Sequence, residues 1–324
     1  MAKILGLGNA LVDVLIMLPN DDLLAETNIQ KGSMKHVERE VIDLLLEQTI
    51  TLKREISSGG SAANAIHGLA RLGNTTSFIG KIGSDHLGSI FHNDMINSGI
   101  APQLLVSEKE TGTAVAFISP DSERSFAVFL GAALELSASD LSAGQFHACD
   151  LLHIEGYLTQ NHELIETAVK MAKSQGLRVS LDMASYNVVE SNLEFLKGII
   201  RDYVDIVFAN EEEALAYTGK DPENAANELA GQCEIAVVKT GARGSLVKSG
   251  DDLYAIDIVP TKVVDTTGAG DLYAAGFLHA LHKGMPLRKC GMAGAILSGK
   301  VISCIGAKIP SEAWPGIITE IKRL

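Results

Sequence analysis

The segment at residues 265–271 reads Asp-Thr-Thr-Gly-Ala-Gly-Asp and stands directly before a predicted helix at 272–283. Gly268 and Gly270 allow the chain to turn tightly and bring backbone N–H groups close to a ligand. Such groups at a helix start favour an anion, and phosphate is the natural ligand. Asp271 lies among these donors. There a carboxylate suits a helix cap and equally suits orienting and deprotonating an attacking hydroxyl.

A second glycine-rich junction lies at residues 57–64, with the sequence Ser-Ser-Gly-Gly-Ser-Ala-Ala-Asn. Gly59 and Gly60 permit close approach to the backbone. Asn64 falls in the first turn of a predicted helix at 61–72, where its amide could reach a ligand hydroxyl. A flexible loop before an alanine-rich helix would show the same residues, so this segment alone indicates little. Two such junctions in one chain favour a site where two ligands meet.

Polar residues follow nearly every short apolar run of the chain. They are Asn9, Asp13, Glu155, Asp182, Asn210, Glu211, Glu213, Lys239, Thr240 and Gly241. Loops are commonly polar, so any one of these residues is unremarkable. In open α/β sheets, however, ligands bind beyond the carboxyl ends of the strands. The recurrence therefore predicts a polar site along that edge of a sheet.

The apolar runs are short and rich in Val, Ile and Leu, which is typical of strands buried on both faces of a parallel sheet. They lie at 4–7, 76–79, 151–154, 178–181, 205–208 and 235–238. Helical patterns at 61–72, 85–98, 162–175 and 272–283 each stop before a glycine that supplies a left-handed cap. This alternation predicts an α/β fold with a central, mostly parallel sheet flanked by helices.

Two segments depart from this alternation of strands and helices. Residues 11–37 read as strands interrupted by polar turns, and residues 111–119 and 125–130 flank a turn as in a β-hairpin. We expect insertions at about 11–37 and 111–130 to form a small β-sheet lid over one end of the large sheet. No linker or repeat interrupts the chain, so residues 1–324 are expected to form a single domain.

The composition excludes several functions. The 27 Lys+Arg and 40 Asp+Glu give a net charge of −13, which argues against a general nucleic-acid binder. No apolar stretch is long enough to span a membrane. The 4 scattered cysteines read as reduced thiols, so we expect a cytoplasmic location. The P-loop pattern is absent, and Leu11 stands where a Rossmann fingerprint needs its third glycine.

Together these motifs resemble the PfkB (ribokinase-like) family of ATP-dependent carbohydrate and nucleoside kinases. The stretch from 59 to 85 is similar to the family's N-terminal pattern, and 265–276 is similar to its highly specific C-terminal pattern. The segments at 8–13, 31–34, 120–126 and 130–133 most resemble the adenosine kinase-like branch. The resemblance implies a ribokinase-like fold with a β lid, and transfer of the ATP γ-phosphate to a primary hydroxyl.

The resemblance also implies roles for single residues. Asp271 matches the catalytic base, and the anion hole matches Gly268, Ala269 and Gly270. Substrate hydroxyls would be held by Asp13, Gly59, Gly60, Asn64 and, as a further candidate, Glu155. ATP would be bound by Asn210, Thr240, Gly241 and Gly244, with Glu213 near Mg²⁺ through metal-bound water. Asp265 and Thr267, together with the region 305–307, resemble a monovalent-cation site that favours K⁺.

The sequence does not identify the molecule that accepts the phosphoryl group. A nucleoside base needs apolar surface, for which the candidates are Leu11, Met17, Met34, Phe117, Phe126 and Phe129, each equally suited to the core. A plain sugar would need polar groups instead. A sugar acid, such as a 2-keto-3-deoxy acid, would need a cation; Arg124 is the candidate, and it also suits a surface turn. The branch likeness favours a nucleoside or a ribose-type sugar.

The competing class is a non-catalytic sugar- or nucleotide-binding protein on the same fold. The retained Asp271 and the complete anion-hole sequence argue against it. The expected partner is a small molecule, neither a nucleic acid nor a membrane. Because lid elements can pair across two subunits, a homodimer is one possible assembly.

Overall fold

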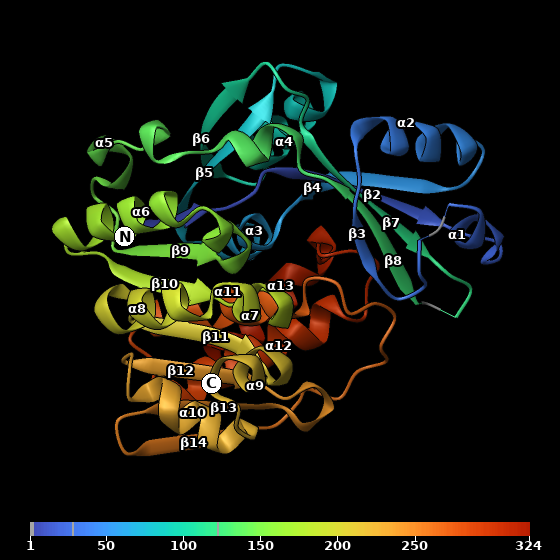
Figure 1. Cartoon of the computed structure of the whole chain (residues 1–324). Coiled ribbons are helices and arrows are strands. Elements are labelled where there is room, and N and C mark those ends of the chain that lie inside the picture. Colours follow the sequence, from blue (N-terminus) through green and yellow to red (C-terminus); the bar gives the residue numbers. More distant parts are fainter. Residues whose placement is uncertain (1–2, 28, 122) are drawn as a thin grey trace.

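The computed structural model describes residues 3–27, 29–121 and 123–324 (Figure 1). Within these ranges, nine strands form a large sheet. Their order is β14 (Asp252–Ile256), β13 (Ser245–Ser249), β12 (Ile235–Lys239), β11 (Ile206–Asn210), β10 (Arg178–Asp182), β9 (Leu151–Glu155), β1 (Lys3–Leu7), β5 (Thr75–Gly83) and β6 (Ile100–Ser107). Neighbours run parallel except at β12–β13 and β13–β14. The predicted mostly parallel α/β sheet is therefore confirmed.

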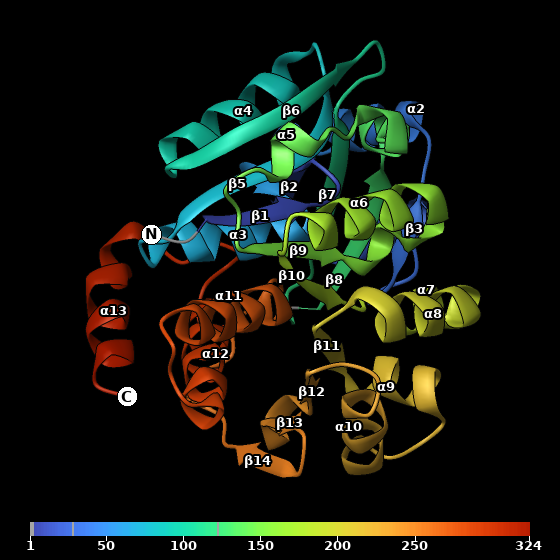
Figure 2. The ribbon, with the colours of Figure 1, turned by 90° about the vertical axis from the view of Figure 1, so that its left-hand side faces the viewer.

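Helices cover both faces of this sheet (Figure 2). One layer contains α3 (Ser61–Arg71), α4 (His86–Asn97), α11 (Ala269–His282), α12 (Leu287–Val301) and α13 (Trp314–Lys322). The other contains α5 (Ala143–Phe146), α6 (His162–Ser174), α7 (Tyr186–Ser191), α8 (Leu193–Tyr203), α9 (Glu211–Thr218) and α10 (Pro222–Ala230). Burial on both faces explains why residues 206–209 of β11 are all apolar. Phe208 packs into the first layer while Val207 and Ala209 pack into the second.

The helices predicted to stop before a glycine do end there. Gly73, Gly99, Gly176 and Gly284 have φ of 84°, 77°, 77° and 72°, the left-handed conformation of a helix C-cap. Shorter 3-10 turns lie at Gly131–Glu135, Ala138–Asp140, Gly156–Gln160, Gly241–Arg243 and Ser311–Ala313.

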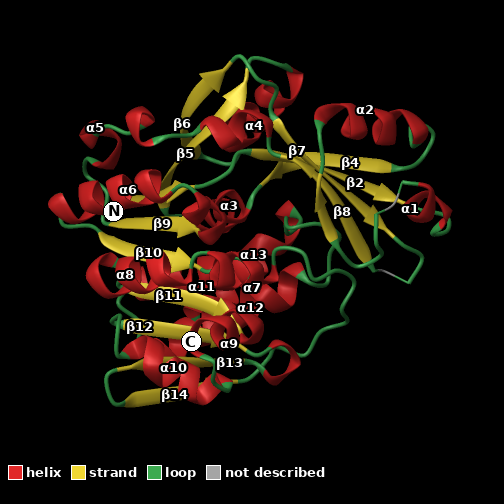
Figure 3. Ribbon diagram, viewed as in Figure 1, coloured by secondary structure: helices red, strands yellow, loops and turns green. Residues whose placement is uncertain are grey.

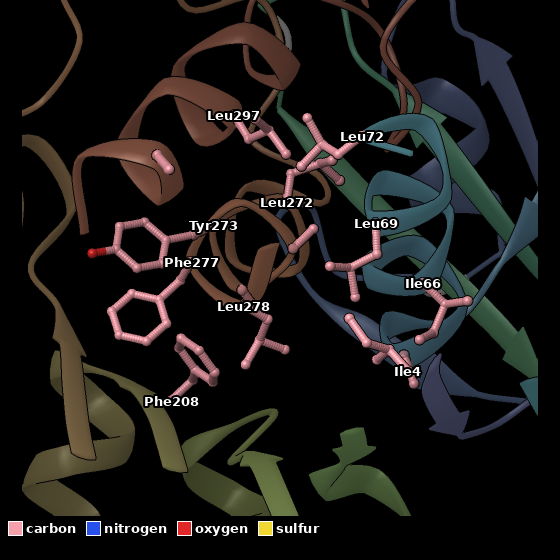
Figure 4. Close-up of a cluster of buried hydrophobic side chains, with 14 of the residues drawn as sticks. Ile4, Ile66, Leu69, Leu72, Phe208, Leu272, Tyr273, Phe277, Leu278 and Leu297 are labelled. Carbon is pink, nitrogen blue, oxygen red and sulfur yellow. The ribbon is translucent and has the colours of Figure 1, made fainter. Parts of the chain in front are cut away.

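Helix α3 packs closely on α11 in the apolar cluster drawn in Figure 4. Leu69 of α3 and Leu272 of α11 belong to that cluster. A Cβ added at Gly68 would lie 2.8 Å from both Ala275 Cβ and Leu272 Cδ1. The absence of a side chain at Gly68 therefore sets how near the two helices come.

A second sheet stands apart from the first (Figure 3). Among the described residues it has five strands, in the order β3 (Met34–His36), β8 (Arg124–Phe129), β7 (Gly112–Ile118), β2 (Leu11–Met17) and β4 (Arg54–Gly59). The segments at 11–37 and 111–130 supply four of these strands, including the hairpin β7–β8. The fifth, β4, comes from a segment in which the sequence predicted no strand.

The two faces of this small sheet differ. On one face, Val14, Ile16, Val115 and Phe117 pack against a cluster that includes residues of α1 (Asp22–Glu26) and α2 (Arg39–Gln48). Because successive side chains of a strand alternate, Leu11 and Asp13 of β2 point to the opposite face. That face looks toward the edge of the large sheet where its parallel strands end.

The four cysteines, all in described segments, are free thiols. No helix within the described ranges is long and apolar enough to cross a membrane.

Candidate active site

Helix α11 begins at Ala269 instead of residue 272, so Gly270 and Asp271 lie in its first turn. Gly268 caps the helix with a φ of 74°, and a Cβ there would lie 2.6 Å from Ala307 Cβ. Both backbone conformation and space therefore require glycine at this position. The first N–H groups of a helix have no acceptor within the helix. These are the N–H groups that the motif predicted to bind an anion, although the Ala269 N–H donates to the Thr266 carbonyl at 3.2 Å.

The Asp271 carboxylate joins the two glycine-rich junctions. Ser61 Oγ donates to Asp271 Oδ1 at 2.7 Å, and Asn64 Nδ2 donates to Oδ2 at 2.9 Å. Burial raises the pKa of Asp271 to about 6; these two hydrogen bonds oppose the rise, Asp182 adds to it and Lys239 lowers it. Both oxygens therefore bond to α3, and Asp271 does not act as a cap of its own helix.

A cavity of about 700 Å³ lies beside the start of α11, and we call it the large-sheet cavity. The ends of β10, β11 and β12 contribute Asp182, Asn210 and Lys239 to its wall. Its other polar lining includes Glu213, Gly270 and Asp271. Apolar lining comes from Ile258, Val259, Val263, Ala295 and Ile302. The cavity is thus polar near α11 and has apolar surface for a flat ring.

Asn210 and Glu213 form a reciprocal cap at the start of α9. Asn210 Oδ1 accepts from the Glu213 N–H at 2.8 Å, while Glu213 accepts from the Asn210 N–H and Nδ2, each at 2.7 Å. Burial raises the pKa of Glu213 to about 7, and Lys239 opposes the rise. The cap fixes both side chains at the cavity wall.

The loop between β12 and β13 closes tightly. The Thr240 N–H donates to the Gly244 carbonyl at 2.8 Å. Gly241 and Gly244 line the large-sheet cavity, whereas Thr240 is buried and does not line it. A Cβ at Gly244 would clash with the Ile256 carbonyl oxygen, so this loop brings bare backbone to the cavity.

A second cavity, of about 670 Å³, lies under the small sheet, and we call it the small-sheet cavity. Its polar lining includes Asn9, Asp13, Gly60, Glu155 and Thr267. Its apolar lining includes Leu11, Met34, Ala114, Phe126, Val128, Leu134 and Leu136. Ser61 and Tyr157 line both cavities, so the two cavities adjoin beside Asp271. Of the apolar candidates, Leu11, Met34 and Phe126 face this cavity, while Phe117 belongs to the core.

Asp13 lies at the polar end of the small-sheet cavity. Burial raises its pKa to about 7, Asp271 adds to the rise, and Lys308 and Arg124 oppose it. A Cβ at Gly59 would clash with the Asp13 carboxylate, so Gly59 provides room for it. Gly60 has a φ of 97°, and a Cβ there would clash with the Asn9 carbonyl oxygen. The paired glycines thus let the chain pass close to Asp13 and Asn9.

The Glu155 carboxylate accepts three hydrogen bonds from the protein. Its carboxylate accepts from the Asn9 N–H at 3.0 Å, from Asn9 Nδ2 at 2.6 Å and from the Ala62 N–H at 3.0 Å. It is only 1% exposed, and burial raises its pKa to about 7 despite these bonds. Although Glu155 lines the cavity, this geometry places it to hold Asn9 and the start of α3.

Arg124 crosses from the small sheet to the loop before α11. Its guanidinium ion-pairs with the buried Asp265 carboxylate and donates to Thr267 Oγ1 at 2.7 Å. Asp265 also accepts from the Thr267 and Gly306 N–H groups. Arg124 therefore already binds the side-chain oxygens of Asp265 and Thr267, which the sequence assigned to K⁺. These residues do not fit a K⁺ ion, and Arg124 is not among the residues that line the small-sheet cavity.

Sequence reasoning assigned no site role to Ser61, Tyr157, Asp182 or Lys239, which line the cavities. Asp182 and Lys239 were among the polar residues that follow strands, so their position alone could have indicated them. Ser61 and Tyr157 carry no such signal, since a serine at a helix start and a tyrosine after a strand are common.

Known proteins resemble this chain along most of its length. The sequence model of the pfkB family carbohydrate kinases matches residues 42–314. A nucleoside kinase of Methanothermobacter thermautotrophicus is 30% identical over 257 residues, 77% of this chain and 80% of that protein. A 5-dehydro-2-deoxygluconokinase of Geobacillus thermodenitrificans is 28% identical over 282 residues, 80% of this chain and 81% of that protein. The crystal structure of adenosine kinase from Sinorhizobium meliloti has a TM-score of 0.89 and 32% identity, covering 99% of each chain.

Proposed function

Because this chain belongs to the pfkB family of carbohydrate kinases, we propose that it transfers the γ-phosphate of ATP to the primary hydroxyl of an adenosine-like nucleoside. That it is a sugar or nucleoside kinase follows from the family and its relatives. The proposal concerns the acceptor. It is carried by one observation: the small-sheet cavity is polar at the Asp13 end and apolar toward β3 and β8.

The polar end suits the ribose. Among the described residues, no hydrogen bond engages the Asp13 carboxylate, so its oxygens are available to accept from two sugar hydroxyls. Asn9, oriented by Glu155, lies beside it in the cavity wall. The apolar end, with Phe126 among its lining residues, suits the flat faces of a base.

The junction of the cavities suits the transfer itself. With a pKa of about 6, Asp271 is ionised at neutral pH and can accept the hydroxyl proton. The N–H groups at the start of α11 would stabilise charge on the transferred phosphoryl group. The small sheet would act as a lid that excludes water from this point.

The large-sheet cavity suits MgATP. Its apolar surface, including Ile258, Val263 and Ile302, would take the adenine ring. Mg²⁺ usually keeps several waters and binds one or two carboxylates together with phosphate oxygens, and Asp182 and Glu213 provide such a pair on the cavity wall. These two residues would hold the ion through water, and the ion would neutralise phosphate charge.

A sugar acid fits the small-sheet cavity less well. The described residues that line it include no lysine or arginine, and Arg124 is engaged by Asp265. The carboxylates of Asp13 and Glu155 would repel an acidic acceptor. This arrangement favours a neutral acceptor over the acid named for the 5-dehydro-2-deoxygluconokinase relative.

The acceptor is tested by ADP release from MgATP with adenosine, ribose, fructose and 5-dehydro-2-deoxygluconate. We expect kcat/KM for adenosine to exceed that of every other acceptor by about tenfold or more. A sugar or sugar acid at the head of the series would overturn the nucleoside proposal. Binding of ATP and adenosine without any ADP release would favour a non-catalytic binding protein.

Two further expectations concern the molecule as a whole. The free thiols support a cytoplasmic location, because disulfides persist mainly in oxidising compartments. The edge strand β4, with Ile56 47% exposed, could pair with a second copy and support a homodimer. Sedimentation of the purified chain tests the second expectation, since a monomer at all concentrations would contradict it.

A further inference from the structure

Lys239 stands at the carboxyl end of β12, and its side chain, 16% exposed, lines the large-sheet cavity. Its Nζ donates to Asp182 Oδ2 at 2.9 Å. It also faces α11, because a Cβ built on Gly270 would lie 3.0 Å from this nitrogen. The ammonium therefore lies between the end of β10 and the backbone of the anion-binding helix start.

Lys239 differs in charge from the rest of its surroundings. Among the described residues that line the large-sheet cavity, it is the only lysine or arginine. Its charged neighbours in that wall are the carboxylates Asp182, Glu213 and Asp271. A polyphosphate entering this cavity would meet one side-chain cation among the described lining residues, and that cation lies where α11 begins.

The Lys239–Asp182 pair is not needed to hold the strands together. Strands β10 and β12 do not pair with each other, and β11 lies between them with backbone ladders on both sides. An ammonium has three N–H donors, and in the described part of the chain only Asp182 accepts a hydrogen bond from Lys239. The remaining donors are available to a ligand in the cavity, while Asp182 fixes where the ammonium lies.

We propose that the Lys239 ammonium contacts the phosphoryl group that ATP transfers and stabilises the charge on its oxygens. The proposal rests on the kinase function above but not on the identity of the acceptor. In the step, the acceptor oxygen bonds to the γ-phosphorus and the bond from that phosphorus to the β-phosphate oxygen breaks, its electron pair leaving with ADP. The hydroxyl proton passes to Asp271, and Lys239 keeps its own protons throughout.

The test is Lys239→Met, which keeps the length of the side chain and removes its charge. We expect kcat to fall by about 10²–10³-fold, the size of effect seen when one donor to a reacting oxyanion is removed. KM for the acceptor should change by less than about threefold, because the acceptor lies in the other cavity.

A binding series supplies a readout that does not depend on turnover. With Mg²⁺ chelated, Kd is measured for AMP, ADP and an ATP analogue with a nitrogen bridge between its β- and γ-phosphates. In Lys239→Met, affinity for AMP should stay unchanged, while affinity for the analogue falls by about tenfold, as expected for one lost charged contact. An equal loss for AMP and the analogue would indicate a merely structural role and overturn the proposal.

The matched control is Lys248→Met. Lys248 is on the neighbouring strand β13, opposite Ala236 of β12, and it does not line the large-sheet cavity. Both kcat and the Kd values of the binding series should therefore stay as in the unaltered chain. Lys239→Arg, which keeps the charge, should recover part of kcat. If Lys239→Met lowers Tm so far that it does not fold, Lys239→Gln replaces it in the same assays.

The two proposals can fail separately. If the unaltered chain prefers a sugar, the nucleoside proposal fails, and the Lys239 variants are assayed with that sugar. If a folded Lys239→Met variant turns over near the original rate with the preferred acceptor, the role of Lys239 is wrong and the acceptor proposal stands.

Discussion

The two cavities that meet at Asp271 are similar in size, about 700 and 670 Å³, and both contain carboxylates, but among the described lining residues only the large-sheet cavity contains a lysine. The large-sheet cavity combines Lys239 and the start of α11 with carboxylates that suit a metal-bound polyphosphate. The small-sheet cavity has the carboxylates of Asp13 and Glu155 and, among its described lining residues, no lysine or arginine. The difference teaches that volume does not separate the two ligands; the lysine and the helix start, which face only the large-sheet cavity, do.

The cavities also differ in what builds them. The large-sheet cavity is lined by strand ends, the loop at Gly241–Arg243 and a helix start, where bare backbone faces the ligand. The small-sheet cavity is lined by side chains of β2, β3, β7 and β8 on one side and by residues within 130–136 and 155–164 on the other. Under the proposed function, the phosphates would face backbone N–H groups together with Lys239, and the acceptor would face mainly side chains.

The largest effect is expected at the junction of the cavities. Asp271→Asn removes the proton acceptor but keeps the shape of the side chain, so kcat should fall by about 10²–10⁴-fold. Isothermal titration should still find ATP and the acceptor bound in their separate cavities. Turnover near the original rate in a folded Asp271→Asn variant would sink the assignment of the base.

Asp13→Asn should affect one cavity only. A hydrogen bond to a charged group contributes about 1.5–3 kcal/mol, so kcat/KM for the acceptor should fall by about 10–150-fold. KM for ATP should stay within about twofold. Asp43→Asn, on the exposed side of α2, is the matched control and should change neither constant. An equal effect on ATP and acceptor would contradict the separation of the cavities.

The pH dependence should show the same separation. Since burial raises the pKa of Asp271 to about 6, the ionised base is present above that pH and is lost below it. The kcat/KM for the acceptor should therefore fall by about tenfold per pH unit on the acid side. Asp13, whose pKa burial raises to about 7, adds a second protonation that the Asp13→Asn variant removes. A profile that stays flat to about pH 4.5 would conflict with both raised pKa values.

Phe126→Ala tests the apolar end of the small-sheet cavity. An aromatic contact contributes about 0.5–1.5 kcal/mol of binding free energy in addition to the effect of the buried surface area. Without it, KM for adenosine should rise by about two- to tenfold. Activity with ribose, which has no base, should not change. If both acceptors weaken alike, the base does not lie against β8.

The smallest effect concerns K⁺. Because Arg124 already occupies Asp265 and Thr267, exchange of K⁺ for Na⁺ at constant ionic strength should leave kcat unchanged. Strong activation by K⁺ would mean that the ion binds elsewhere or displaces Arg124, and titration of Arg124→Met with K⁺ would separate these outcomes.

Much of the fold could be predicted from the sequence, because β1, β5 and β9–β12 are apolar runs buried on both faces. Strand β4 was missed because it reads Arg-Glu-Ile-Ser-Ser-Gly, a partly exposed edge strand without a clear alternation. The start of α11 was placed too late because glycine is a poor helix former, and only the left-handed Gly268 shows that the helix begins before Gly270.

The motifs of the site could be recognised in the sequence, but the hydrogen-bond partners of its residues could not. The glycine-rich junctions at 57–64 and 265–271 indicated that two ligands meet, but the hydrogen bond that joins the junctions, from Asn64 to Asp271, was not predicted. The partner of Arg124 lies 141 residues away, a distance that no local pattern spans. Glu155 looked like a ligand residue because it follows a strand, but its hydrogen bonds depend on Asn9 and Ala62 arriving from elsewhere in the fold.

The close packing of α3 on α11 has an evolutionary consequence. Gly68 brings the two helices together, and their starts carry Ser61 and Asn64 on one and Asp271 on the other. The geometry of the reacting groups is thus set by a helix pair to which the small sheet contributes no residue. After gene duplication, side chains on β2, β3 and β8 are free to diverge and admit new acceptors while the chemistry beneath them is inherited intact.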